Sequence, residues 1–218
     1  MAGCTYLTED QVVEVFDYFG TKQNALRNQT MLMIGVTTGL RISDILNLKI
    51  RDVAFKDCSI NEIAIKDIIR IKTVKTERSI ELNVYQAIKI LLKKYIQELW
   101  RKRFRGGHRF LFPSPCYRQA PLTIRRAQML FNHAAEALHI SGQISTHTLR
   151  KTFARQVYYK LRSLDSDPWP VLMVLLDHTN IATTQMYLSF LFTRDDKRYL
   201  TAFEKWDGCF AVYKSDEI

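Results

Sequence analysis

A stretch rich in Ile and Val, residues 52–82, interrupts a chain whose other hydrophobic patterns are helical. Within it, "DVAF", "INEIAIKDIIRIK" and "RSIEL" are separated by polar turns, and short runs rich in β-branched residues favour strands. We therefore predict a small three-stranded antiparallel sheet, with "KTVKTER" as the turn between its last two strands. A short sheet enclosed by helical sequence indicates an α+β fold that is mainly α.

Two helical segments precede the sheet. Thr8 and Gln11 form a capping box in front of residues 9–19, which predicts that a helix begins there. The next helical run ends at Gly39, which is suited to the left-handed conformation that often follows the last turn of a helix.

Helical periodicity returns after the sheet. From Val84 onward, apolar residues recur with a period of about 3.6, and lysines occupy the opposite face. Further helices are expected after Thr123 and after Ser145 or Thr146, because these hydroxyl residues are good N-caps. Two or three short helices should follow them. Since no repeat or long linker divides the chain, we expect one compact domain.

The composition is ordinary for a globular protein, with 47% apolar and 25% charged residues among 218. No apolar stretch is long enough to span a membrane, and the N-terminus lacks the pattern of a secretory signal. The four cysteines are far apart, so we interpret them as reduced thiols and not as a zinc site or a disulfide framework. These features favour a cytoplasmic protein without a bound metal.

The positive charge is concentrated in residues 89–126, which contain eleven Lys and Arg and a single acid. This excess equals the net charge of +10 of the whole chain and favours binding to a polyanion. A solvated helix face with a basic loop is the plainer alternative, and a membrane surface is disfavoured because no exposed apolar face accompanies the segment. The expected DNA contacts are Lys93, Lys94, Arg101, Lys102, Arg103, Arg105, Arg109, Arg125 and Arg126.

The sequence lacks the motifs of several kinds of catalytic site. The sequence has no G-x-x-x-x-G-K-[ST] loop for a nucleotide and no G-x-S-x-G turn. No carboxylates have the spacing of metal ligands, which argues against two-metal cleavage of a phosphodiester. If the protein acts on nucleic-acid phosphates, it must therefore use cations and a side-chain nucleophile.

Two segments offer such cations. Arg41 follows a predicted helix end, where its side chain can leave the helix, and Asp44 stands three residues later. His147 and Arg150 lie one turn apart at the N-terminal end of a predicted helix. The partial positive charge and free N–H groups of such an end favour a phosphate.

His178 and Tyr187 stand nine residues apart, which is a weak motif by itself. Taken together, however, "TTGLRISDILNL", "HTLRKTFA" and "LLDHTNIATTQMYL" resemble the three signature segments of the tyrosine site-specific recombinases, the phage integrase family. The segments occur in the family's order, and the joint pattern is highly specific.

The resemblance covers roughly residues 7–190 and implies the family's helical catalytic domain with its small sheet. It also implies that DNA strands are cleaved and rejoined through a covalent 3′-phosphotyrosine. In this mechanism Tyr187 would be the nucleophile, and Arg41 and Arg150 would hold the scissile phosphate. His147 would assist the loss of the phenolic proton.

Three further residues receive roles from the resemblance. Lys72, on the last hairpin of the sheet, matches the family's catalytic lysine and would protonate the leaving 5′ oxygen, with Lys75 as the competing assignment. His178 would donate a hydrogen bond to the phosphate, and Asp44 would orient its neighbours. Because the phosphotyrosine conserves the bond energy, neither a metal nor ATP nor another cofactor is expected.

The sequence departs from the family's pattern at three places. Lys151 stands where a second histidine is more common, and Asp177 stands where glycine usually precedes the third-segment histidine. The spacing between Arg150 and His178 is several residues longer than expected, and "SLDSDPWP" has the character of an insertion.

The resemblance also suggests an organisation. We expect a catalytic domain over residues 1–190 and a C-terminal tail over residues 191–218 that either packs on its own core or is exchanged between subunits. We expect the helical core-binding domain that precedes the catalytic domain in most relatives to be absent. The expected partner is double-stranded DNA with specific recombination sites, bound by a homotetramer on two duplexes in the cytoplasm, in association with the nucleoid.

Two other functions remain open at this stage. A type IB-like topoisomerase would use the same chemistry to cut and reseal one strand. A non-cleaving accessory protein of the same fold would bind DNA without needing Tyr187. The sequence does not separate integration, excision, inversion and resolution.

Overall fold

The computed structural model describes residues 4–55, 63–75, 77–102, 109–117 and 119–188. In these ranges the chain forms helices α1 (Glu9–Gly20), α2 (Ala25–Thr38), α3 (Ile42–Asn47), α4 (Ile50–Val53), α5 (Gln86–Arg101), α6 (Ile124–Ala137), α7 (Thr146–Arg162), α8 (Pro168–Leu175) and α9 (Ile181–Tyr187), and strands β1 (Ile68–Lys72) and β2 (Ser79–Asn83). The predicted mainly helical α+β fold is confirmed. None of the helices within these ranges is both long and apolar enough to cross a membrane.

The predicted helix caps are present. The Thr8 hydroxyl accepts a hydrogen bond from Gln11 N, and the Gln11 side chain accepts one from Thr8 N, so the capping box of α1 is complete. Gly39 adopts φ 66° directly after α2. At the start of α7, Ser145 and not Thr146 is the N-cap.

The sheet has two antiparallel strands in the described residues, not the three that the sequence predicted. Where the first strand was expected, Asp52 accepts a hydrogen bond from Lys49 N at 2.8 Å and caps the short helix α4. This local side-chain bond favours a helical turn over an extended strand. Ala54 then pairs with Ile65 in an isolated antiparallel bridge, and residues 56–62 lie outside the described ranges.

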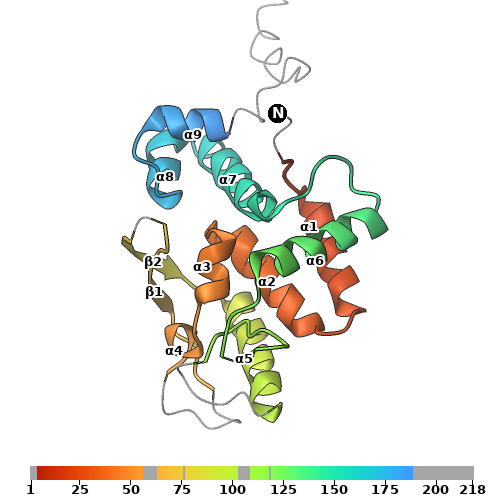
Figure 1. Ribbon diagram of the computed structural model, residues 1–218. Helices are drawn as coiled ribbons and strands as arrows, with labels where there is room; N and C mark the ends of the chain where they lie inside the picture. Colours follow the sequence, from red (N-terminus) through yellow and green to blue (C-terminus); the bar gives the residue numbers. More distant parts are fainter. Residues whose placement is uncertain (1–3, 56–62, 76, 103–108, 118, 189–218) are drawn as a thin grey trace, which may run out of the picture.

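Helix α2 lies between the other helices, and α7 packs against it. A side chain at Gly35 of α2 would come within 2.5 Å of Leu149 of α7, so glycine permits this close approach. A second, smaller hydrophobic cluster joins α7 to α8 and α9 through Phe153, Leu172 and Leu188. In Figure 1 these last two helices lie at the end of the molecule opposite α4 and α5, with the β1–β2 hairpin below α8.

Replacement of Gly39 by alanine should destabilise the fold. The left-handed backbone would be strained, and the added Cβ would lie 2.3 Å from Phe153 Cδ1. We expect a loss of about 2–5 kcal/mol of unfolding free energy, measured by urea denaturation, from backbone strain and overpacking. Gly20→Ala is the matched control, because its Cβ would meet only the end of the Gln29 side chain, at 3.1 Å. Equal stability losses in the two variants would contradict this explanation.

Candidate active site

Arg150 lies at the centre of the candidate site and is only 5% exposed. Its Nη1 donates a hydrogen bond to Gly39 O at 2.6 Å, and its Nη2 donates one to Leu176 O. Burial, and secondarily the charge of Arg41, lower the pKa of Arg150 to about 10, so it remains a cation at neutral pH. The side chain thus holds the ends of α2 and α8 together while it places a positive charge between them.

Arg41 is brought near Arg150 by the turn after α2. It is the N-cap residue of α3, and its side chain is 17% exposed. Its Nη1 forms an ion pair with Asp177 Oδ2, at 3.7 Å, in the turn between α8 and α9. The two predicted clamp arginines therefore do approach each other, and each lowers the pKa of the same neighbour, His178.

His147 is the second residue of α7, and its backbone N–H donates to the Ser145 hydroxyl at 3.1 Å. Desolvation lowers the pKa of its ring below the ordinary value, and the charges of Arg150, Lys151, Arg41 and Lys75 lower it further. A histidine in this environment is neutral at pH 7 and is able to accept a proton.

His178 and Tyr187 face each other across the turn into α9. Their ring centroids are 5.5 Å apart with an interplanar angle of 77°, an edge-to-face contact. Nδ1 of His178 shares a hydrogen bond of 3.0 Å with the hydroxyl of Thr184, which is fully buried. Burial and the two nearby arginines lower the pKa of His178 to about 4, so its ring is also neutral.

The Tyr187 hydroxyl is buried and has no hydrogen bond of normal geometry within the described residues. Burial raises the pKa of this phenol above its ordinary value, while Arg150 and Arg41 act in the opposite direction. The phenol is therefore protonated at neutral pH. The ammonium of Lys151 lies 5.8 Å from the centre of the tyrosine ring and donates a hydrogen bond to Cys4 O.

The hairpin β1–β2 places its two candidate lysines differently. Lys72, the last residue of β1, is exposed, and its ammonium lies 3.1 Å from Glu77 Oε2. Lys75, in the turn, is close enough to lower the pKa of both His147 and His178. Of the two lysines, it is therefore Lys75 whose charge acts on both histidines.

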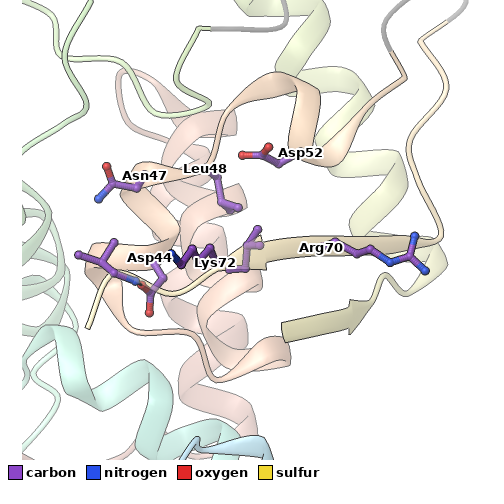
Figure 2. Close-up of a pocket in the computed structure, with 8 residues that line it drawn as sticks. Asp44, Asn47, Leu48, Asp52, Arg70 and Lys72 are labelled. Atoms are coloured by element: carbon purple, nitrogen blue, oxygen red, sulfur yellow. Dashed lines mark hydrogen bonds between the residues drawn. The ribbon is translucent and has the colours of Figure 1, made fainter. Parts of the chain in front are cut away.

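Asp44 anchors this hairpin to α3. It is 4% exposed, and its Oδ1 accepts a hydrogen bond from Val74 N at 2.8 Å. Its other oxygen has no hydrogen-bond partner among the described residues. Figure 2 shows the small pocket that Asp44 and Asn47 line together with Lys72 and Arg70, both on β1. That Asp44 orients catalytic neighbours stays a prediction.

The predicted DNA contacts on α5 do not lie at this site. Helix α5, which carries several of them, lies at the opposite end of the molecule from α9 (Figure 1). The exposed predicted contacts on or directly after α5 are Lys93, Lys94, Arg101 and Lys102, and those at the start of α6 are Arg125 and Arg126. Arg109 is half-buried, and Arg103 and Arg105 lie outside the described residues. That these residues contact DNA stays a prediction.

Other charged residues that the sequence did not assign do lie at the site. In the sequence, Lys151 and Asp177 stood out only as departures from the family's pattern, and no motif indicated a role for Arg78. Arg78 reaches the site by an ion pair of 3.1 Å with Asp177. Within the described ranges, no group of three or more His, Cys, Asp or Glu side chains has the arrangement of a metal site.

Comparison with known proteins identifies the family. A sequence profile described as the phage integrase family matches residues 5–194. The chain belongs to the phage integrase family. A tyrosine recombinase of Thermosipho africanus is 28% identical over 84% of this chain and 56% of its own length. The probable integrase/recombinase YoeC of Bacillus subtilis is 26% identical over 82% of this chain and 85% of its own length.

Solved structures of integrase-family proteins share the fold. The recombinase XerH, crystallised with its palindromic difH substrate as a post-cleavage complex, gives a TM-score of 0.68 at 20% identity. The match covers 93% of this chain and 53% of XerH. The XerA recombinase gives 0.66 at 19% identity, covering 92% of this chain and 64% of XerA. The chain spans about half the length of several of the curated relatives that it matches.

Proposed function

We propose that this chain catalyses site-specific DNA recombination, in which strands are broken and rejoined through a covalent 3′-phosphotyrosine. The observation that carries the proposal is the convergence of Arg41, Arg150 and the neutral ring of His178 on one tyrosine, Tyr187, from three separate segments of the chain, with His147 beside the same two arginines. A core aromatic residue would not need two guanidinium groups beside its hydroxyl. Membership of the phage integrase family supports the same reading.

The steps follow from the chemistry of these groups. The guanidinium groups of Arg41 and Arg150 bind the non-bridging oxygens of the phosphate and stabilise the charge of the transition state. The Tyr187 oxygen attacks phosphorus as its proton passes to neutral His147, and the bond to the 5′ oxygen breaks. His178 donates a hydrogen bond to the phosphate. The 5′ oxygen takes a proton from a hairpin lysine and leaves as a hydroxyl.

Rejoining reverses these steps with the 5′-hydroxyl of a different strand, which restores a phosphodiester and frees Tyr187. No metal or ATP enters this balance. The proposed partner is double-stranded DNA, engaged by four copies of the chain on two duplexes. Solved relatives are described as bound to DNA, among them XerH with difH and a lambda integrase dimer on a core site. The exposed lysines and arginines of α5 and α6 are proposed to contribute phosphate contacts.

The proposal is tested by incubating the full chain, without added metal, with nicked suicide duplexes from which the cleaved end diffuses away. We expect a protein–DNA adduct that survives a denaturing gel. Products joined from two duplexes would separate a recombinase from a type IB-like topoisomerase, which would instead relax supercoils without exchanging partners. A duplex that is bound selectively but never forms an adduct would contradict the proposal and favour an accessory DNA-binding protein.

The general acid is expected to be Lys72, although it is the charge of Lys75 that lowers the pKa of both histidines. Lys72→Ala should slow single-turnover cleavage by about 10²–10⁴, the usual contribution of a general acid. Lys75→Ala, in the same hairpin, is the matched control and should keep most of the rate. A scissile 5′-bridging sulfur should restore cleavage by the Lys72 variant, because a thiolate leaves without a proton. The reverse pattern, with Lys75→Ala slow and rescued by sulfur, would assign the acid to Lys75.

A further inference from the structure

Asp177 places a negative charge against the cations of the site. Its carboxylate lies between two guanidinium groups, with Oδ2 at 3.7 Å from Arg41 Nη1 and Oδ1 at 3.1 Å from Arg78 Nη1. The aspartate side chain is only 9% exposed, so water screens these charges poorly. Arg41 is one of the two groups that the proposed mechanism assigns to the phosphate.

The backbone at Asp177 is unusual for a residue with a side chain. Its φ is 48°, in the left-handed region that glycine adopts most easily and that aspartate tolerates better than most residues. Glycine would therefore build this turn at lower conformational cost. What the aspartate adds at this position is its carboxylate.

The same carboxylate joins three segments that carry functional side chains. Arg41 is the N-cap of α3, Arg78 directly precedes β2 in the hairpin, and Asp177 directly precedes His178. Lys72, on the other strand of the hairpin, is meanwhile paired with Glu77. The Arg78–Asp177 ion pair thus connects the hairpin to the turn before α9, while the candidate acid Lys72 is paired with Glu77.

A carboxylate and a phosphate cannot both use the same guanidinium edge without repelling each other. We infer that Asp177 is an internal competitor for the substrate phosphate: it occupies Arg41 in the DNA-free chain, and an entering phosphate displaces it. This rests on the proposed function for the identity of the substrate. The displaced carboxylate keeps Arg78 as a partner, so its charge is not left buried and unpaired. Because 59% of the Arg78 side chain is exposed, this arginine has room to follow it.

The competition is measurable without DNA and without cleavage. Inorganic phosphate is titrated into the full chain at pH 7 and constant ionic strength, and the ring signals of His147 and His178 are followed by NMR. Asp177→Asn removes the charge but keeps the size of the side chain. This variant should bind phosphate about tenfold more tightly than the wild type, because loss of this partly buried ion pair should change affinity by an amount between those for exposed and for buried ion pairs.

Asp165→Asn is the matched control. Asp165 also has a left-handed backbone, with φ 53°, and its substitution changes the net charge by the same amount, but its exposed side chain lies in the turn after α7. It should leave phosphate affinity unchanged. If Asp177→Asn fails to fold, as judged by its thermal midpoint, Asp177→Gly suits the same backbone and carries the same prediction.

An unchanged or weaker phosphate affinity in the Asp177 variants would overturn the inference. An equal gain in phosphate affinity in Asp165→Asn would also overturn it. So would a titration in which added phosphate shifts the ring signals of neither His147 nor His178. Failure of the proposed function has a different signature, the absence of a covalent adduct, which leaves the phosphate titration unaffected.

Discussion

Arg150→Ala is expected to lose both stability and cleavage. Its guanidinium donates to two backbone carbonyls, Gly39 O and Leu176 O, and both would be left without that donor. Since hydrogen bonds from a charged group contribute roughly 1.5–3 kcal/mol each, we expect the loss of these two to lower the unfolding free energy by about 3–6 kcal/mol. Single-turnover cleavage should fall by at least about 10²–10³, the effect of removing one preorganised donor from a transition state.

The two losses have to be separated. Cleavage is therefore measured at a temperature at which urea titration shows each variant to be folded. Arg155→Ala, in the same helix, is the control: its guanidinium stacks on the rings of Tyr6 and Tyr159, at 4.7 and 4.9 Å, away from the two carbonyls. We expect this variant to cleave DNA at nearly the normal rate. A folded Arg150→Ala protein with normal cleavage would remove Arg150 from the mechanism.

Tyr187→Phe is expected to show the opposite combination, with stability retained and covalent chemistry lost. The substitution removes one buried oxygen that has no hydrogen bond of normal geometry in the described structure, so the loss is limited to its interaction with Arg150. We expect the unfolding free energy to change by less than about 1 kcal/mol. Adduct formation on a suicide duplex should disappear entirely, because no other atom replaces the nucleophile.

The control for this substitution is Tyr158→Phe. Tyr158 also lies in the second hydrophobic cluster, where its ring contacts Tyr159 and Trp169 at centroid distances of 5.5 and 5.4 Å. Its hydroxyl has no role in the proposed chemistry, so this variant should form adduct like the wild type. If Tyr187→Phe still forms adduct, the nucleophile is a different residue and the proposed site is wrong.

The parts of the fold that sequence analysis predicted correctly depend on local interactions. The capping box at Thr8 and the left-handed Gly39 involve residues within one turn, and the apolar stripe of α5 is a periodic pattern. The prediction of a third strand was wrong because a local interaction prevailed over the composition on which the prediction rested. A short side-chain bond from Asp52 stabilised a helical turn where the β-branched composition favoured an extended chain.

The site was predictable where it follows the signature segments and not where it depends on tertiary contacts. Arg41, Arg150, His178 and Tyr187 are brought together as the resemblance to the family implied. The pairing of Asp177 with Arg78 joins residues 99 positions apart, which no local pattern encodes. In the same way, the charge count of residues 89–126 could not reveal that α5 and α9 lie at opposite ends of the molecule, because composition does not specify where a segment lies in the fold.

The central claim is that Tyr187 becomes covalently attached to DNA, and mass spectrometry of the trapped adduct tests it most directly. The adduct from a suicide duplex is digested with nuclease and protease, and the peptide that retains a 3′-nucleotide is sequenced by fragmentation. We predict a single modified peptide, with the phosphate on the phenolic oxygen of Tyr187. A nucleotide on another tyrosine, such as Tyr158 or Tyr159, or on a serine, would contradict the account.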